Sequence, residues 1–396
     1  MQTYLNELGV ICTLGEGKRA VAEALFAGDD SGIRQETGWV PGRQLPLGAV
    51  RVPLPAMPAH LSGSRDNRNN RLLLAAAQEI EAPLRAAVAA YGPARVGVVI
   101  GTSTTGIHEA CQGIAAWRAQ GQWPDDYRYA HQELGAPAAC LAEWLGASGP
   151  CFGISTACTS GARALLSAQR LLRMGLCDAV VCGGVDTLAG LPINGFHALE
   201  AMDSGRCQPF SRNRRGINIG EAAAVFLMTR EPFRIALLGG GASSDAWHMS
   251  SPDPEGRGAQ AAMQAALDDA GLNASDIDYL NLHGTATEQN DAMESLAVSR
   301  LFDAALPCSS TKSMTGHTLG AAGALEAAFC WLSLNDGQDE RRLPPQRWDG
   351  QADPTLPPLA FTHVGSALPA TGVRRLMSNS FAFGGNNAAV ILGDAT

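Results

Sequence analysis

The chain has 396 residues, of which 46% are hydrophobic and 17% charged, a composition typical of a globular protein with a large core. Its formal net charge of −9 excludes a general nucleic-acid-binding protein, although a local basic patch could still face an acidic partner. The N-terminus, MQTYLNELGV, lacks the features of a secretory signal, and no segment approaches the roughly 18 to 20 apolar residues of a membrane span. Ten cysteines without a CxxC pair indicate reduced thiols and not a disulfide framework, so we expect a cytoplasmic protein.

The predicted elements alternate between helix and strand. A helical pattern over 71–91 precedes the apolar run RVGVVI at 95–100, which we predict to be a buried strand followed by the loop GTSTTG. Next, STACTSGARALL opens a predicted helix over 158–172, and Gly175 is placed to end it. The valine-rich stretch at 178–186 is a second predicted strand. Short connectors between such patterns are typical of α/β layering.

The same order of elements recurs later in the chain. A helix predicted over 259–271 precedes the strand DYLNL, the loop HGTAT and another helix, and the segment 316–332 opens with small residues as 158–172 does. The recurrence predicts two similar α/β halves that face each other. The loops of the second half should then lie beside Cys158.

We divide the chain into an N-terminal half, 1–235, and a C-terminal half, 236–396. Within the second half, the polar and proline-rich stretch 336–358 is predicted to be a surface loop. The chain ends in NSFAFGGNNAAVIL, where Gly384 and Gly385 form a tight turn between two strand-like runs. Such a turn can aim backbone N–H groups at an oxyanion, but it is also an ordinary hairpin signal.

Cys158 lies at the start of a predicted helix, among small and hydroxyl residues. A helix N-terminus carries partial positive charge and unpaired N–H groups, so we expect it to favour the thiolate. Ala157, Gly161 and Ala162 leave room for a ligand to approach. The arrangement is typical of a nucleophile, although a buried packing thiol is the commoner role of a free cysteine.

Two histidines occupy glycine- and threonine-rich loops of the second half, where catalytic groups are commonly displayed. His283 follows an apolar strand in LHGTAT, and His317 lies at a predicted helix start in KSMTGHTLGAAG. Glu326 interrupts the apolar helix GALEAAFCWL, so we predict a buried pair with Lys312 that could orient the nearby imidazole. Cys158, His283 and His317 are also possible zinc ligands, but the sequence offers no close ligand pair for that alternative.

Together these segments resemble the β-ketoacyl-[acyl carrier protein] synthases, specifically the two-histidine condensing enzymes of the thiolase-like fold. The resemblance covers essentially the whole chain, and its five motifs occur in the same order. They are TACTSG, PFSRNRRGINIGEAAA, HGTATEQNDAMES, KSMTGHTLGAAGALEA and NSFAFGGNN. The resemblance implies an α/β, thiolase-like fold with two similar α/β halves in a layered α-β-α-β-α arrangement.

The resemblance also implies roles for individual residues. The catalytic set comprises Cys158, His283, His317, Lys312 and Glu326. Cys158 corresponds to the acyl-accepting nucleophile, the histidines to the decarboxylating pair, and the other two to their supporting charges. Phe383 matches the aromatic gate, whose backbone N–H joins that of Cys158 in the oxyanion hole. Thr285 and Thr287 match threonines that contact the pantetheine arm.

The implied reaction is a decarboxylative Claisen condensation by an acyltransferase. An acyl thioester is transferred to the cysteine, malonyl-carrier loses carbon dioxide, and the resulting carbanion attacks the acyl-cysteine. No metal or dissociable cofactor is expected, because the substrates arrive on the phosphopantetheine of acyl carrier protein. Departures from the family pattern, such as GINIGEAAA, leave fatty-acid, aryl polyene and polyketide pathways open and favour a specialised one. Acyl-chain length is not predicted.

The carrier protein of this family is acidic, so the resemblance implies a basic docking patch. Arginine suits the recognition of phosphate and carboxylate groups. The candidates are Arg65, Arg68, Arg71, Arg206, Arg212, Arg214 and Arg215. For each arginine taken alone, an ordinary solvated charge is an equally open alternative.

Family members form dimers through a sheet edge, which implies a homodimer or a heterodimer with a homologous chain-length-factor-like subunit. The alternative function is a non-catalytic carrier-binding or chain-length-determining subunit of the same fold, but the chain-length factor lacks the nucleophile. A biosynthetic thiolase needs a second cysteine near the C-terminal glycines. A class III initiating synthase pairs its cysteine with one histidine and an asparagine. Neither fits the motifs present.

Overall fold

The structure is a computed structural model that describes residues 1–336 and 340–395. Its main sheet has twelve strands in the order β12-β11-β10-β13-β14-β9-β1-β8-β7-β5-β6, with β2 (Gly15–Glu16) paired beside β1. The first half contributes β1 (Thr3–Cys12), β5 (Val96–Gly101), β6 (Cys151–Ile154), β7 (Ala179–Asp186) and β8 (Ala222–Thr229). The second half contributes β9 (Ile235–Ser244), β10 (Tyr279–Asn281), β11 (Pro307–Ser309), β12 (Ala360–Phe361), β13 (Arg375–Ala382) and β14 (Asn386–Asp394). A separate hairpin pairs β3 (Ile33–Glu36) with β4 (Leu45–Gly48).

The helices between these strands also divide by half. The first half has α1 (Lys18–Ala27), α2 (Ser62–Arg65), α3 (Arg68–Glu79), α4 (Glu81–Tyr91), α5 (Ile107–Gln120), α6 (Ala136–Leu145), α7 (Ser160–Arg173) and α8 (Gly190–Ala198). The second half has α9 (Arg257–Ala270), α10 (Glu288–Leu301), α11 (Lys312–Thr315) and α12 (Ala322–Asn335). Short 3₁₀ turns are η1 (Pro93–Arg95), η2 (Tyr129–Gln132), η3 (Ala274–Asp276), η4 (Leu319–Ala321) and η5 (Phe383–Gly385). None of the helices in the described part of the chain is both long and apolar enough to cross a membrane.

The two halves follow one topology. In the first half, β5, β6 and β7 are parallel, and β8 and β1 follow as antiparallel neighbours. In the second half, β10, β11 and β13 are parallel, and β14 and β9 follow in the same way. The halves join where β1 pairs with β9. The predicted repeat of two similar α/β halves is therefore confirmed.

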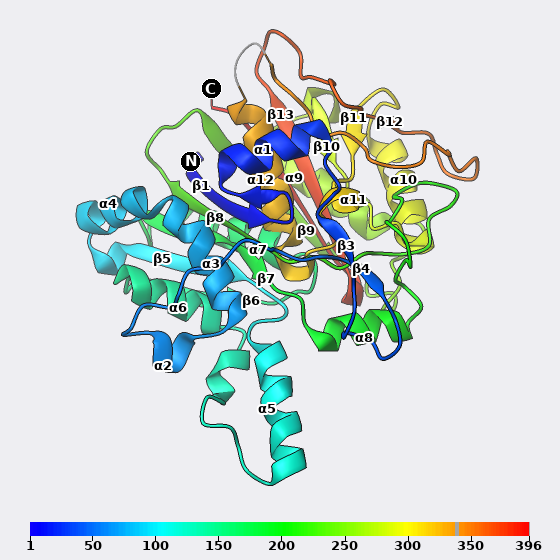
Figure 1. Ribbon diagram of the computed structural model, residues 1–396. Helices are drawn as coiled ribbons and strands as arrows, with labels where there is room; N and C mark the ends of the chain where they lie inside the picture. The colour runs from blue at the N-terminus through cyan, green and yellow to red at the C-terminus, as the bar shows by residue number, and fades with distance from the viewer. Residues whose placement is uncertain (337–339, 396) are drawn as a thin grey trace.

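The elements form five layers (Figure 1), and three of the apolar clusters among the described residues lie between these layers. Helices α3, α4 and α6 cover the outer face of the first half, and α9 and α10 cover the outer face of the second. Helices α7 and α12 lie in contact between the two half-sheets. A Cβ on Gly161 would lie 2.6 Å from the backbone nitrogen of Ala324, so the close approach of these two helices requires glycine. This packing brings the loop before α7 next to the loop before α12.

Two predicted elements differ from the structure. The single helix predicted over 71–91 is split into α3 and α4 at Ile80, because Pro83 cannot donate a hydrogen bond and its ring clashes with the carbonyl of Glu79. The surface loop predicted over 336–358 lies partly outside the described residues, since 337–339 are not described. In its described part, Leu343, Pro344, Pro345 and Gln346 are buried.

Candidate active site

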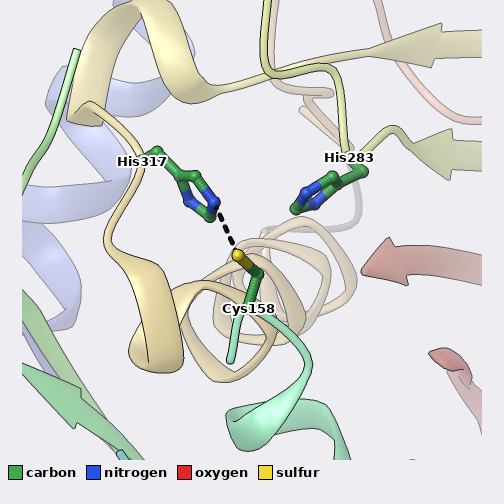
Figure 2. A group of neighbouring side chains, drawn as sticks. All are labelled: Cys158, His283 and His317. Atoms are coloured by element: carbon green, nitrogen blue, oxygen red, sulfur yellow. Dashed lines mark hydrogen bonds between the residues drawn. The ribbon is translucent and has the colours of Figure 1, made fainter. Parts of the chain in front are cut away.

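Three side chains from three loops converge between the two halves (Figure 2). Cys158 follows β6, His283 follows β10 and His317 follows α11. The Nε2 atom of His317 lies 3.0 Å from the sulfur of Cys158, and the two imidazole rings are 5.3 Å apart and nearly perpendicular. All three side chains are buried. The prediction that loops of the second half lie beside Cys158 is confirmed.

A strained turn presents the sulfur. Ala157 has a φ of +53°, in the left-handed region that residues other than glycine rarely adopt. The turn is held by Ser160 Oγ, which accepts from the Thr156 N–H at 2.9 Å, and by Thr159 Oγ1, which donates to the Thr156 carbonyl at 2.8 Å. Helix α7 begins at Ser160, so Cys158 precedes the helix by two residues and does not lie in its first turn as predicted.

Burial has the largest influence on the pKa of Cys158. Loss of hydration raises the pKa of Cys158 to about 12, because it outweighs the opposing effect of the Lys312 ammonium group. This direction runs against the predicted thiolate and favours a protonated sulfur in the free site. Reaction at this sulfur requires a base within hydrogen-bond reach, and His317 Nε2 is in that position.

The first half holds the backbone of His317. Its N–H donates to the carbonyl of Asn218 at 2.6 Å, and its carbonyl accepts from the Gly220 N–H at 3.0 Å. Burial lowers the pKa of His317 well below its usual 6.5, and the charge of Lys312 lowers it further. The ring is therefore neutral and can accept the proton of the thiol. Neither Asn218 nor Gly220 was assigned this role from the sequence.

Lys312 determines the tautomer of His283. Its Nζ lies 3.4 Å from His283 Nδ1 and donates to the His283 carbonyl at 2.5 Å. An ammonium group can only donate, so Nδ1 is the acceptor and the ring proton lies on Nε2. Burial, then Lys312 and His317, lower the pKa of His283 well below its usual value. The result is a neutral imidazole with one N–H to donate at Nε2.

The predicted pair of Lys312 and Glu326 is present as an ion pair, with side chains that are only 1% and 3% exposed. Burial raises the pKa of Glu326 to about 7 even though Lys312 lowers it. The pair connects α12 to the His283 loop, because the same ammonium group contacts Glu326 and His283.

Two buried carboxyl groups that the sequence analysis passed over hold the backbone of the His283 loop. Glu294 accepts from the N–H groups of His283 and Gly284, each at 2.7 Å, and Asp291 accepts from the Ala286 N–H at 3.2 Å. Burial raises the pKa of Glu294 to about 7 and that of Asp291 to about 6. The available signal was their spacing of three residues, which places both acids on one helix face.

A cavity of about 500 Å³ opens onto the three side chains. Its lining includes Cys158, His283, His317, Phe196, Arg215, Thr285, Thr287 and Phe383. The hydroxyls of Thr285 and Thr287 are 2.9 Å apart, so the two threonines form one polar patch on the wall. The cavity is therefore built from both halves of the chain, with apolar and polar sides.

Phe383 lies at the turn between β13 and β14, where Gly384 and Gly385 have φ values of +80° and +74°. Its ring is 37% exposed and packs 5.3 Å from the ring of Phe196. Among the described residues, no oxygen accepts a hydrogen bond from the backbone N–H of Phe383 or from that of Cys158. No backbone carbonyl of the described residues therefore competes with a substrate oxygen for either N–H group.

The seven predicted docking arginines differ in how free their guanidinium groups are. Ion pairs join Arg65 to Glu143, Arg68 to Glu221, Arg71 to Asp66, Arg206 to Asp30 and Arg214 to Asp353. The side chain of Arg214 is only 8% exposed. Arg212 and Arg215 are exposed, and no ion pair joins either one to another described residue. These two are the candidates with a guanidinium group free to bind a partner.

Cys158, His283 and His317 could also be considered as metal ligands, because one donor atom of each lies within 4.8 Å of the others. A metal-bound histidine usually donates its second ring N–H to a carboxylate or carbonyl. Here the second nitrogen of His283 faces the ammonium group of Lys312, which repels a dication. The donor set therefore does not fit zinc.

Comparison with known proteins identifies relatives over most of the chain. The family model described as "Beta-ketoacyl synthase, N-terminal domain" matches residues 64–232, and the one described as "Beta-ketoacyl synthase, C-terminal domain" matches 235–346. The 3-oxoacyl-[acyl-carrier-protein] synthase 2 of Staphylococcus aureus is 35% identical over 264 residues. That alignment covers 62% of this chain and 64% of the relative, so it spans less than two thirds of either protein.

Solved structures match along the full length. A chain from the complex of the ketosynthase ApeO with its chain length factor ApeC, from Xenorhabdus doucetiae, is 46% identical with a TM-score of 0.93. The match covers 100% of this chain and 98% of that one. A chain from the ishigamide ketosynthase/chain length factor is 27% identical with a TM-score of 0.86, and covers 100% and 99%. These similarities confirm the expected family resemblance and fold.

Proposed function

The chain belongs to the β-ketoacyl synthase family, and we propose that it is a type II ketosynthase that condenses malonyl-carrier with an acyl chain bound to Cys158. The observation that carries the proposal is the placement of one thiol and two neutral imidazoles in a single cavity. His317 Nε2 lies 3.0 Å from the sulfur, and His283 has its Nε2–H free because Lys312 occupies the Nδ1 side. The first half-reaction needs a base for the thiol proton, and the second needs a hydrogen-bond donor to the enolate oxygen.

The first half-reaction transfers the acyl group to Cys158. The sulfur attacks the carbonyl carbon of an acyl thioester while its proton passes to His317 Nε2. The backbone N–H groups of Cys158 and Phe383 donate to the oxyanion that forms. When the intermediate collapses, the bond to the carrier's sulfur breaks, and that sulfur leaves as a thiol with the proton from the His317 imidazolium.

The second half-reaction begins with malonyl-carrier. Breaking the bond between its carboxylate and α-carbon releases carbon dioxide and leaves an electron pair as an enolate. His283 donates to the enolate oxygen from Nε2. His317 is the second donor, since it can carry its proton on Nε2 once the sulfur is acylated. The α-carbon then attacks the acyl carbonyl, the C–S bond breaks, and the Cys158 thiolate takes up a proton from solvent water.

This reaction needs neither a metal nor a dissociable cofactor, because the acidic and basic groups are side chains. Both substrates would enter on phosphopantetheine, with the paired hydroxyls of Thr285 and Thr287 on the cavity wall as contacts for its amides. An acidic carrier protein would meet the exposed Arg212 and Arg215, of which Arg215 lines the cavity.

A second subunit of the same fold is the proposed partner. Strand β6 ends the sheet, so one of its edges has no partner among the described strands, and Phe152 on it is 38% exposed. Helix α5, which extends from the body of the protein in Figure 1, adds Trp117, which is 42% exposed and stacked on Trp123. Exposed apolar surface of this kind is typical of an interface. The subunit would be an identical chain or a homologous chain-length factor.

A specialised polyene or polyketide pathway is favoured over primary fatty-acid synthesis. The full-length match at 46% identity is to a chain from a ketosynthase–chain length factor complex, whereas the 3-oxoacyl synthase 2 relative is 35% identical over part of the chain. The departures from the family pattern in the sequence agree with this choice. Aryl polyene assembly is one such pathway.

Trapping the acyl-enzyme tests the function. The protein is incubated with acyl-carrier and then malonyl-carrier, and the peptide containing Cys158 and the carrier are analysed by mass spectrometry. We expect an acyl adduct on Cys158 and a 3-oxoacyl-carrier two carbons longer. Cys158→Ala should abolish both. Cys111→Ser, which changes an exposed cysteine on α5, should retain both.

Absence of both the adduct and the product would indicate the alternative, a non-catalytic subunit. A chain that binds carrier but forms neither adduct nor product, alone or with its homologous subunit, is a carrier-binding or chain-length-determining subunit.

A further inference from the structure

A buried carboxylate outside the proposed reaction lies at the C-terminal end of β7. Asp186 has no solvent exposure, and it accepts six hydrogen bonds. Five donors come from the GTSTT loop after β5: Thr102 Oγ1 at 2.7 Å, Ser103 N at 2.8 Å, Ser103 Oγ at 2.5 Å, Thr104 N at 2.8 Å and Thr104 Oγ1 at 2.9 Å. The sixth is the Gly320 N–H of the second half, at 2.6 Å.

The chemistry of this set requires a hydrogen-bond acceptor at both oxygen positions of Asp186. Three of the six contacts are backbone N–H groups, which can only donate, and they reach both oxygens: Ser103 and Thr104 donate to Oδ1 and Gly320 to Oδ2. The pKa of Asp186 is raised above its usual value, because loss of hydration by burial outweighs the hydrogen bonds from Ser103, Thr104 and Thr102 that lower it. An amide at this position could not accept from all of them, because its nitrogen is a donor.

Both segments bound by Asp186 contain a strained residue. Thr105 has a φ of +47° and Leu319 a φ of +51°. Such conformations persist only when the surrounding structure over-determines them. A Cβ on Gly320 would lie 2.7 Å from Asp186 Oδ2, so the carboxylate also contacts a position that only glycine can occupy.

These segments flank the reacting groups. Gly320 follows His317 by three residues and lies in the middle of η4, the turn that leads into α12. The GTSTT loop follows β5, whose last residue, Gly101, packs directly on the backbone of Ser160 in the first turn of α7. Asp186 therefore joins the His317 segment to the GTSTT loop by hydrogen bonds, and that loop reaches the Cys158 side through the packing of Gly101 on Ser160.

We propose that Asp186 is a positioning residue that fixes the GTSTT loop and the His317 segment to each other, and so maintains the contact between His317 and Cys158. The effect on rate rests on the proposed function, whereas the coupling of the two segments can be tested without it. Misplacement of a catalytic group by 1 Å can reduce a rate by about 10²-fold.

Hydrogen exchange measured by mass spectrometry tests the coupling. In Asp186→Asn, we expect exchange to become at least tenfold faster in peptides covering 101–106 and also in those covering 316–322. Peptides covering 283–287 should be unchanged, because Glu294 and Asp291 hold that loop. The matched control is Asp178→Asn, which alters a carboxylate at the other end of β7 that pairs with surface arginines. Faster exchange in only one segment, or in neither, overturns the proposal.

Thr104 variants keep the proposal testable if Asp186→Asn does not fold. Thr104→Val removes one donor to Asp186 and retains the shape of the side chain, whereas Thr104→Ser retains the hydroxyl. We expect Thr104→Val to increase exchange in both segments and Thr104→Ser to match the wild type. Equal exchange in the two variants contradicts the proposal.

Kinetics tests the consequence for catalysis. We expect Asp186→Asn to lower kcat by about 10- to 100-fold with KM for malonyl-carrier within about twofold of the wild type, because substrate contacts are unaltered. A kcat equal to that of Asp178→Asn excludes a positioning role. A wild-type protein without condensing activity refutes the proposed function instead, and leaves the exchange result to decide the coupling.

Discussion

Arg68 donates hydrogen bonds from Nε and Nη2 to the carboxylate of Glu221, which has no solvent exposure. Glu221 also accepts from the backbone N–H groups of Val50 at 2.8 Å and Leu188 at 3.1 Å. Arg68 is therefore the counterion of a buried charge that joins α3 to the start of β8. This structural role explains the arginine without any carrier protein, and it separates Arg68 from Arg212 and Arg215.

Reversing charges at the cavity mouth should weaken carrier binding. The double variant Arg212→Glu with Arg215→Glu is expected to raise the Kd for acyl carrier protein about tenfold at low salt, with unchanged stability. Arg68→Glu should instead lower the free energy of unfolding by about 1–3 kcal/mol or more, because it leaves Glu221 without its counterion. Titration of binding at two ionic strengths and urea unfolding measure these effects. Arg19→Glu, a 93% exposed side chain on α1, is the control. Unchanged carrier affinity in the double variant contradicts the docking assignment.

The alkylation rate of Cys158 should increase with pH up to at least pH 10. Because burial raises the pKa of Cys158 to about 12, the reactive thiolate is a small fraction at neutral pH. Iodoacetamide labelling between pH 6 and 10, followed by peptide mass spectrometry, measures this dependence. The exposed Cys111 is an internal reference in the same sample. A plateau for Cys158 below pH 8 would show a stabilised thiolate and refute the stated protonation.

The two histidines should affect different half-reactions. His317→Ala is expected to slow acylation of Cys158 by about 10²- to 10⁴-fold, because it removes the base 3.0 Å from the sulfur. His283→Ala should acylate at nearly the wild-type rate but lose about 10²- to 10³-fold in release of carbon dioxide from malonyl-carrier. Single-turnover acylation and ¹⁴CO₂ release separate the two steps. Equal losses in both steps for both variants would contradict the division of roles.

As the pH rises from about 4.5 to 7, the free energy of unfolding of the wild type should fall. The same quantity for Glu294→Gln, which lacks this titrating group, should not show that fall. Burial raises the pKa of Glu294 from 4.5 to about 7, so the folded state binds a proton in this range and the unfolded state does not. That contribution to stability is fully present below the unfolded pKa and is lost as the pH rises through the folded pKa. The difference should be on the order of 3 kcal/mol. Urea unfolding at pH 5 and 8 measures it, with the exposed Glu288→Gln as the control. Parallel pH profiles for wild type and Glu294→Gln would contradict the shifted pKa.

Much of the fold could be predicted from the order of the sequence patterns. The strands at 95–100 and 178–186 and the helix after Cys158 follow from apolar runs and glycine stops, and the structure confirms them as β5, β7 and α7. Helix ends were less predictable, because the break at Ile80 depends on Pro83 three residues later. The pairing of β1 with β9, which joins the halves, leaves no signal in either segment alone.

The site divides in a similar way. Cys158, His283 and His317 could be selected from their motifs. Lys312 and Glu326 could be selected as a pair, because a charged residue in an apolar helix needs a partner of opposite charge. Asp186 could not be selected, since a buried carboxylate that accepts backbone N–H groups looks like any other acid in sequence, and for Glu294 the one signal was its spacing from Asp291. Their role depends on which distant N–H groups face them.

By itself the sequence determined the residue types, the repeated order of helices and strands, and which side chains could donate or accept a proton. The tertiary structure alone decided that two halves bring three loops into one cavity and that burial there raises the pKa of the sulfur. The physical reason is that hydration is lost through packing: the pKa of a thiol depends on how much water and charge the whole fold leaves around it, and no neighbouring residues in the chain encode that amount.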